Sequence, residues 1–363
     1  MTTYLLAGGG TAGHVNPLLA VADGLRERDP SAEILVLGTR EGLEARLVPE
    51  RGYELLFVEK VPFPRRPNRD AAAFPTRFRR AVSQVRAYVR ERGVDVVVGF
   101  GGYASAPAYV AAGRAGVPVV VHEANAKPGM ANILGARSAA GVGVAFEGTP
   151  LKRSRVVGMP LRREIVDLDR AGLRVDAAAH FGLDPDRPTL LVFGGSLGAL
   201  RLNEAFGEGY GGAWRDVLDA GWQLLHVTGE RSALVDPGVS GYVVRRYIDR
   251  MDLAFAAADL IVSRAGSATV SEISALGIPT VYVPYAVGNG EQALNASSAV
   301  RLGAAILIPD ADFTADRVRT DVLPLLADDA RRAAMAEAAA TVGTRTGTEN
   351  VIAMIDAAVK TIR

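Results

Sequence analysis

The chain alternates short runs of aliphatic and β-branched residues with longer stretches rich in Ala, Arg and Leu, and this alternation restricts its possible folds more than any other feature. The apolar runs are nearly continuous, as expected for strands buried on both faces of a parallel sheet with helices between them. The pattern predicts an α/β fold of doubly wound parallel sheets. The candidate strands are TYLLAGG, EILVLG, DVVVGFGG, VPVVVHE, RVVGMP, TLLVFGGS, WQLLHVTG, GYVVRRY, DLIVSRAG, PTVYVPY and AAILIP.

This alternation occurs twice along the chain. In each half the first strand ends in a Gly-rich turn, at 8–13 and again at 194–199. Single cores rarely grow beyond about 250–300 residues, so we expect a chain of 363 residues to form two domains. We place the boundary near Gly158–Pro160, so that a second domain begins at 161.

Composition excludes several classes of protein. Hydrophobic residues make up 49% of the chain, enough for two packed cores, and the net charge of +1 does not indicate a polyelectrolyte binder. No nucleic-acid recognition motif occurs, and we expect no nucleic-acid partner. Without cysteine, disulfides and thiolate metal sites are impossible. We expect neither a membrane-spanning segment nor a signal peptide, because no long apolar run occurs and the first strand begins near Met1.

The first Gly-rich turn places Gly8, Gly10 and Gly13 in the spacing G-x-G-x-x-G, directly before His14. A dinucleotide site would add an acidic residue at the end of the second strand, but LVLGTR ends without one and Glu41 follows the turn. The glycines could also serve only a tight turn. His14 favours a functional loop, because open α/β sheets bind ligands at this edge and imidazole accepts a proton near neutral pH. His14 is therefore a candidate general base.

The second Gly-rich turn follows the predicted strand 189–193. Its glycines at Gly194, Gly195 and Gly198 let the backbone approach a ligand, and Ser196 offers a hydroxyl near the start of a helix. The free N–H groups at a helix N-terminus favour an anion. No Gly-Lys-Ser/Thr follows, so this is not a Walker loop. The turn predicts a diphosphate site, with a plain turn as the alternative.

A third small-residue segment, SRAGSATVSE, contains Ser267 and Ala268 and leads into a helix that carries Glu272. A carboxylate in the first two turns of that helix can accept hydrogen bonds from the vicinal hydroxyls of a ribose, or can only complement the helix dipole. Further on, the segment GNGEQALNA presents Glu291 and Gln292, whose groups suit sugar hydroxyls. Elsewhere we expect His180 and His226 to be structural.

Taken together, the segments resemble the bacterial cell-wall family that transfers GlcNAc to undecaprenyl-pyrophosphoryl-MurNAc-pentapeptide (lipid I), giving lipid II. The resemblance spans nearly the whole chain and implies a GT-B fold, two Rossmann-like domains facing a cleft. It assigns acceptor binding to an N-terminal domain of residues 1–160, joined by 345–363. It assigns UDP-GlcNAc binding to a C-terminal domain of residues 161–344. The matching stretches, in the family's order, are GGGTAGHVNPLLA, GFGGYASAP, HEANAKPGMAN, VGMPLR, GGSLGALRLNE, VSRAGSATVSEISALGIPTVYVPY and GNGEQALNA.

The resemblance also implies roles for individual residues. His14 would remove the proton from the MurNAc 4-hydroxyl in an inverting displacement at UDP-GlcNAc, with no cofactor. We also expect no obligatory catalytic metal, because no D-x-D-like pair stands by the proposed phosphate site. The residues implied on the acceptor side are Gly10, Tyr103, His122 and Glu123. Those implied in donor binding are Thr11, Gly13, Asn125, Arg162, Ser196, Ile248, Ser267, Ala268, Thr269, Glu272, Glu291 and Gln292.

Three positions depart from the better-known family pattern. A second glycine is replaced by Ala12, a glutamine by Leu197, and the first of two adjacent glutamines by Glu291. The change at Glu291 bears on sugar recognition. A carboxylate still accepts a hydrogen bond from a sugar hydroxyl, so the assignment is kept.

The segment 62–93 contains nine arginines against only Asp70 and Glu91. Its apolar residues at helical spacing are Phe74, Phe78, Val82, Val85 and Val89. It could form an ordinary helix with an apolar stripe in the core. Alternatively, phenylalanines including Phe63 contact lipid while the arginines meet anionic headgroups. The resemblance implies a peripheral protein at the cytoplasmic face of the bacterial cell membrane.

Other functions are compatible with such a fold, because fold does not fix the acceptor. The main alternative is a GT-B glycosyltransferase with a different lipid or natural-product acceptor. A nucleotide-sugar epimerase, a non-catalytic UDP-sugar sensor and a nicotinamide enzyme are less favoured by these motifs.

Overall fold

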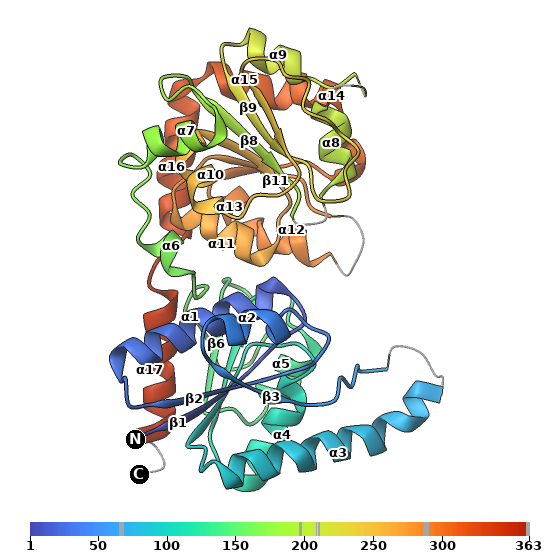
Figure 1. The fold of residues 1–363 in the computed structure, drawn as a ribbon, viewed down its shortest axis with the longest axis vertical. Coiled ribbons are helices and arrows are strands. Elements are labelled where there is room, and N and C mark those ends of the chain that lie inside the picture. Colours follow the sequence, from blue (N-terminus) through green and yellow to red (C-terminus); the bar gives the residue numbers. More distant parts are fainter. Residues whose placement is uncertain (65–68, 196–197, 208, 210, 286–289, 361–363) are drawn as a thin grey trace. The chain divides into compact units, whose positions relative to one another are not determined.

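The computed structural model describes residues 1–64, 69–195, 198–207, 209, 211–285 and 290–360 (Figure 1). The chain divides into two compact units. Unit 1 comprises Met1–Arg163 and Arg345–Arg363, and unit 2 comprises Glu164–Thr344.

The core element of unit 1 is a seven-stranded parallel sheet of order β3-β2-β1-β4-β5-β6-β7. Tyr4 of β1 pairs with Ile34 on one side and with Val96 on the other, so the strand order reverses between β1 and β4. The strand expected from RVVGMP ends earlier than predicted, at Val156. The strands are β1 (Thr3–Ala7), β2 (Glu33–Gly38), β3 (Glu54–Phe57), β4 (Val96–Gly99), β5 (Val119–Glu123), β6 (Gly141–Val144) and β7 (Ser154–Val156).

Helices cover both faces of this sheet because successive strand residues point to opposite sides. Leu6 packs with α1, α2 and α17, whereas Leu5 packs with α3 and α4. The C-terminal helix α17 lies against α1 and against β5 and β6, so the chain returns to unit 1 after completing unit 2 (Figure 1). The helices are α1 (Ala12–Arg28), α2 (Glu44–Glu50), α3 (Arg69–Glu91), α4 (Ser105–Ala115), α5 (Met130–Gly135) and α17 (Gly347–Lys360).

Unit 2 repeats this architecture with six parallel strands in the order β10-β9-β8-β11-β12-β13, and its reversal lies between β8 and β11. Leu190 and Val192 pack on the side of α8 and α9, and Phe193 meets Phe255 of α10 on the other. Two parallel-sheet units of Rossmann type confirm the predicted fold class. The strands are β8 (Thr189–Phe193), β9 (Gln223–Val227), β10 (Tyr242–Arg245), β11 (Leu260–Ser263), β12 (Thr280–Tyr282) and β13 (Ala305–Leu307). The helices are α6 (Arg163–Val166), α7 (Arg174–Phe181), α8 (Leu200–Phe206), α9 (Trp214–Asp219), α10 (Met251–Ala257), α11 (Ser267–Ala275), α12 (Glu291–Asn295), α13 (Ser297–Arg301), η1 (Asp310–Asp312), α14 (Ala315–Arg317), η2 (Val318–Val322), α15 (Leu323–Ala327) and α16 (Asp329–Val342).

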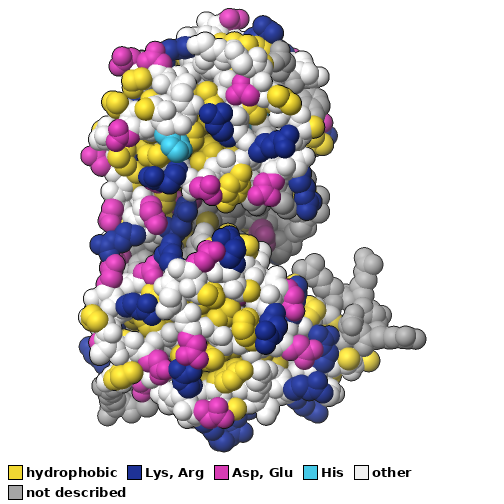
Figure 2. Space-filling view, viewed as in Figure 1, with side chains coloured by type: hydrophobic (Ala, Val, Ile, Leu, Met, Phe, Trp, Pro, Cys, Tyr) yellow, Lys and Arg dark blue, Asp and Glu magenta, His cyan; other side chains and the backbone are white. Residues whose placement is uncertain are grey.

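The surface carries charges of both signs. On the face drawn in Figure 2, Lys and Arg side chains are interspersed with Asp and Glu over both units. This distribution agrees with a net charge of only +1. Within the described ranges, no helix is both long and apolar enough to cross a bilayer.

Candidate functional site

Each unit has one point at which the order of its strands reverses. In open parallel sheets, ligands bind outside the carboxyl ends of the strands at this point, because the neighbouring loops lead to opposite faces of the sheet. In unit 1 the loops concerned follow β1 and β4, and in unit 2 they follow β8 and β11. Many of the residues predicted from sequence lie in these four loops or in the first turns of the helices that follow.

His14 lies half-buried in the first turn of α1. Its Nδ1 lies 3.1 Å from the carbonyl oxygen of Gly9 and 3.3 Å from the hydroxyl of Thr11, the N-cap residue. A carbonyl oxygen only accepts hydrogen bonds, so Nδ1 carries the hydrogen, and in the neutral ring the lone pair is then on Nε2. The ring therefore offers Nε2 as a proton acceptor.

The loop after β4 approaches His14 through two glycines. Gly101 and Gly102 both have positive φ, at 94° and 81°. A Cβ added at Gly101 would lie 3.0 Å from Nε2 of His14, and one added at Gly102 would lie 2.4 Å from the carbonyl oxygen of Gly9. Glycine at both positions thus permits the close packing of the two loops.

The other predicted residues of these loops differ in exposure. Tyr103 is exposed, and Nζ of Lys60 lies 4.9 Å from the centroid of its ring. Gly10 is half-buried with a φ of 91°, and Gly13 lies in the first turn of α1. Tyr103 therefore presents the largest accessible side chain of the two loops to a ligand.

Glu123, at the end of β5, is buried and organises the segment that follows. Its Oε1 accepts a hydrogen bond from the backbone N–H of Asn125 at 2.9 Å. Its Oε2 accepts from the N–H of Gly129 and from Nδ2 of Asn132, both at 2.9 Å. The carboxylate is satisfied within its own segment and sets the position of Asn125, which is half-buried.

His122 is fully buried beside Glu123. Its Nε2 donates to the carbonyl oxygen of Gly158 at 3.0 Å, which links β5 to the segment that leaves unit 1. Its Nδ1 has no hydrogen-bond partner among the residues that the structure describes. Burial lowers the pKa of this imidazole, so the ring is neutral near pH 7. Arg162 follows in the same outgoing segment and is half-buried.

In unit 2, the loop after β8 contains Ser196, which lies outside the described residues. Gly195 and Gly198 on either side have φ of 95° and 83°. A Cβ at Gly198 would lie 2.1 Å from the carbonyl oxygen of Thr228, so a larger residue cannot take this place without moving the backbone. The helix α8 begins directly afterwards, at Leu200.

The loop after β11 leads into α11, which carries four of the predicted residues in its first two turns. Ser267 begins this helix and is buried, and Ala268 and Thr269 are half-buried. Glu272 is half-buried one turn further on. A compact group of small and carboxylate side chains therefore lies at the reversal point of this sheet.

The remaining predicted residues of unit 2 lie in other segments. Ile248 is buried, whereas Glu291 and Gln292 are half-buried in the first turn of α12. Oε1 of Gln292 accepts a hydrogen bond of 2.8 Å from the backbone N–H of Tyr285. This bond anchors α12 to the segment that follows β12.

Sequence interpretation missed several residues that build this site. Asn132 donates to Glu123 and accepts from the hydroxyl of Tyr109 at 2.7 Å. In the sequence, the only indication of a role for Asn132 is that it is a single amide residue within the apolar stretch GMANILG. Glu44 hydrogen-bonds the first Gly-rich loop, but in the sequence it resembles any acidic residue in the first turn of a helix.

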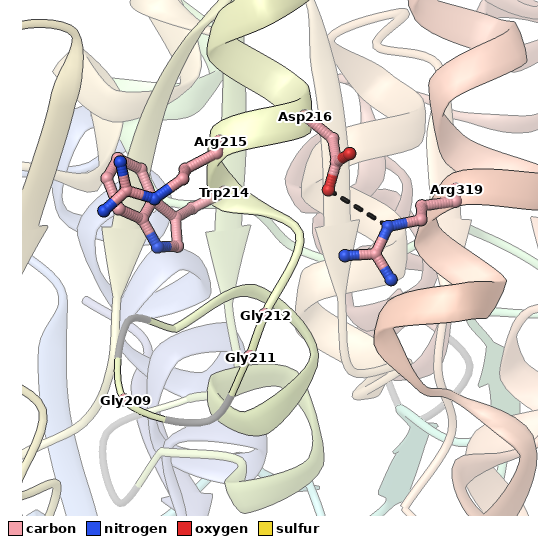
Figure 3. Close-up of a pocket in the computed structure, with 7 residues that line it drawn as sticks. All are labelled: Gly209, Gly211, Gly212, Trp214, Arg215, Asp216 and Arg319. Carbon is pink, nitrogen blue, oxygen red and sulfur yellow. Dashed lines mark hydrogen bonds and ion pairs between the residues drawn. The ribbon is translucent and has the colours of Figure 1, made fainter.

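Two further features of unit 2 lie apart from these residues. His226 is buried between Tyr242 and Asn203, at 3.1 Å from each, and burial lowers its pKa to about 3. A surface cavity of 420 Å³ is bordered by the ion pair of Asp216 and Arg319 (Figure 3). None of the predicted site residues lines it. The lining residues are Gly209, Gly211, Gly212, Trp214, Arg215, Asp216 and Arg319.

Comparison with known proteins first defines the class. Residues 4–144 match the N-terminal domain of glycosyltransferase family 28, and residues 189–351 match its C-terminal domain. With two Rossmann-like units, these matches define a glycosyltransferase of GT-B fold.

Full-length relatives then define the family. A protein of Clavibacter michiganensis is 60% identical over 99% of this chain and 97% of its own length, and one of Streptomyces coelicolor is 49% identical over 97% and 96%. Both are named UDP-N-acetylglucosamine–N-acetylmuramyl-(pentapeptide) pyrophosphoryl-undecaprenol N-acetylglucosamine transferase. The crystal structure of MurG from Acinetobacter baumannii is 27% identical, with a TM-score of 0.78 over 98% of this chain and all of that one. The chain belongs to this transferase family.

Proposed function

We propose that this protein transfers GlcNAc from UDP-GlcNAc to the MurNAc 4-hydroxyl of lipid I, with inversion at the anomeric carbon, and so forms lipid II. The observation that carries this proposal is full-length similarity to a transferase of that name, at 60% identity. Such a product serves peptidoglycan synthesis, and through it cell shape and division. An acceptor of another lipid or natural-product class has no comparable support.

The chemical step assigns the base to His14. Nε2 takes the proton of the attacking hydroxyl, while the bond from Nδ1 to the Gly9 carbonyl keeps the ring in the required tautomer. The UDP leaving group gains negative charge as the glycosidic bond breaks. The N–H groups near Ser196 and the Arg162 guanidinium would stabilise that charge.

Donor binding is proposed for the reversal point of unit 2. Glu272 accepts from the ribose hydroxyls, with Ser267, Ala268 and Thr269 lining the approach on the same helix. The backbone at Ile248 reads uracil. The proposed contacts to the sugar come from Thr11, Gly13, Asn125, Glu291 and Gln292.

On the acceptor side, Gly10 and Tyr103 would contact lipid I. His122 and Glu123 are buried, and their hydrogen bonds lie within unit 1. We therefore propose that these two residues hold the loop that presents Asn125 and do not touch the acceptor.

A lipid-linked acceptor requires access to the membrane, and we propose that unit 1 binds the cytoplasmic face peripherally through α3. The rings of Phe63, Phe74 and Phe78 pack together, with centroids 5.4 to 6.4 Å apart. Arg79 and Arg80, which follow Phe78 in α3, are exposed and available to anionic headgroups. In Figure 1 the N-terminal turns of α3 extend beyond the sheet of unit 1.

The direct test is transfer of labelled GlcNAc from UDP-GlcNAc to a short-chain analogue of lipid I. We expect a single product whose new bond has inverted configuration. Transfer to a soluble aglycone but not to the analogue would contradict the proposed acceptor. Conversion of UDP-GlcNAc without any acceptor would instead indicate an epimerase.

A further inference from the structure

Glu44 is a fully buried carboxylate at the start of α2, and it joins the ends of two neighbouring strands. Its Oε2 accepts a hydrogen bond of 2.7 Å from the backbone N–H of Gly10, in the loop after β1. Its Oε1 accepts from the backbone N–H of Thr39 at 2.8 Å and from the Thr39 hydroxyl at 2.9 Å, beyond the end of β2. One side chain thus connects the first Gly-rich loop to the adjacent strand.

Three glycines form the socket around this carboxylate. A Cβ added at Gly9 would lie 2.2 Å from Oε1 of Glu44, and one added at Gly42 would lie 2.0 Å from Oε2. A Cβ at Gly38 would lie 2.4 Å from Cγ. All three distances are far below van der Waals contact, so the backbone closes directly on the carboxylate. The peptide at Gly9 cannot shift toward α2 while Glu44 is in place.

The same peptide holds the proposed base. The carbonyl oxygen of Gly9 accepts from Nδ1 of His14, and Gly102 packs against that carbonyl. We propose that Glu44 is a positioning residue for the transfer reaction. By fixing Gly9 and Gly10, it holds the carbonyl that keeps His14 oriented with its lone pair on Nε2. This inference rests on the proposed role of His14.

Glu44→Gln removes one of the two acceptor oxygens through which the carboxylate connects Gly10 and Thr39. The amide has the same shape but only one acceptor oxygen, so its NH₂ group must face the N–H of either Gly10 or Thr39. Thr39→Val is the matched control, because it removes one donor to the same carboxylate and leaves the bond to Gly10 intact. We expect E44Q to lower kcat about tenfold or more through misplacement of the base. We expect KM for UDP-GlcNAc to change much less than kcat, and T39V to keep kcat within about threefold.

A double-mutant cycle with His14→Ala tests whether Glu44 acts through the imidazole. We expect E44Q to lower turnover in the wild-type background and to add almost nothing in the H14A background. Equal losses in both backgrounds, or equal losses in E44Q and T39V, would overturn the inference. If E44Q does not fold, as judged by its unfolding transition, Glu44→Asp replaces it with the same expectations, because it keeps both oxygens but withdraws them by one methylene.

The outcomes separate this inference from the proposed function. If H14A keeps wild-type turnover, the proposed base is wrong and the inference fails with it. If H14A loses turnover while E44Q keeps it, the base stands and only the role of Glu44 is wrong.

Discussion

At the scale of single residues, one hydrogen bond determines which nitrogen of His14 is basic. The Gly9 carbonyl can only accept, so it keeps the hydrogen on Nδ1 and leaves Nε2 as the acceptor. The backbone, and not a carboxylate, thus fixes the tautomer.

His14→Ala should lower kcat by about 10²–10⁴-fold, the usual contribution of a general base. UDP-GlcNAc affinity, measured by titration calorimetry, should remain close to that of the wild type. His180→Ala is the control, because His180 is exposed on α7 and should leave both quantities unchanged. Turnover of H14A within a few-fold of the wild type would contradict the assignment.

Gly102→Ala should destabilise unit 1 and reduce turnover. The left-handed φ alone costs a non-glycine residue about 1–2 kcal/mol, and the new Cβ would overlap the Gly9 carbonyl. Gly113→Ala is the same substitution at an exposed position inside α4 with open space around it, and should raise the free energy of unfolding by about 0.5–1 kcal/mol. Urea unfolding of both variants checks this contrast.

At the scale of elements, the apolar stripe of α3 lies only partly in the core of unit 1. Val82, Val85 and Val89 are buried in the core of unit 1, as an ordinary amphipathic helix requires. Phe74 and Phe78, nearer the N-terminal end, are only partly buried. The apolar stripe therefore extends from the core toward the surface that we propose to meet lipid.

Replacing both Arg79 and Arg80 by Gln should weaken binding to vesicles that contain phosphatidylglycerol. Each arginine near an anionic surface contributes about 1 kcal/mol, so the expected loss is on the order of tenfold or more for the pair. Arg90→Gln, an exposed change at the other end of α3, is the control. Cosedimentation at low and high salt gives the measurement, and binding insensitive to salt would contradict an electrostatic contact.

The elements were largely predictable, whereas the connections within the site were not. Strand positions and the first Gly-rich turn follow from local composition, and the spacing in that turn indicated His14 directly. Glu44 and Gly102 matter through contacts with Gly9 and Gly10 across other loops, and no local pattern encodes such contacts. Asn132 acts through Glu123, which only the folded segment brings near.

At the scale of the whole molecule, each unit buries one histidine, and both have lowered pKa values. The unfolded chain binds a proton at such a position below pH of about 6.5, whereas the folded chain resists protonation. Stability from these groups is therefore complete above that pH and is lost as the pH falls.

The stability that neutral His226 contributes should be lost as the pH falls from about 6.5 to about 3. The free energy of unfolding should fall by up to about 1.4 kcal/mol per pH unit over this range. His226→Gln should be less stable than the wild type at pH 7.5, because the hydrogen bonds of the imidazole ring with Tyr242 and Asn203 are lost. Its stability should decline less steeply toward pH 5. Urea unfolding of unit 2 at the two pH values tests this, and equal slopes for both proteins would contradict it.

Saturating UDP should stabilise unit 2 selectively. A ligand at 100 times its Kd stabilises the state that binds it by about 2.7 kcal/mol. Hydrogen exchange should therefore slow in β8, β11 and α11, while the strands of unit 1 remain unchanged. Protection confined to unit 1 would contradict the assignment of the donor to unit 2.

The position of α17 also governs the order of events on the ribosome. Val351 and Ile355 are buried in the core of unit 1, although all of unit 2 is translated between them and Arg163. During synthesis, residues 1–163 would therefore expose the apolar surface that α17 covers until residues 347–360 leave the ribosome. Residues 164–344 form a continuous unit and need no later segment to complete their core. Unit 1 is synthesised first but would complete its core last, and its exposed apolar surface would be a binding site for chaperones in the meantime.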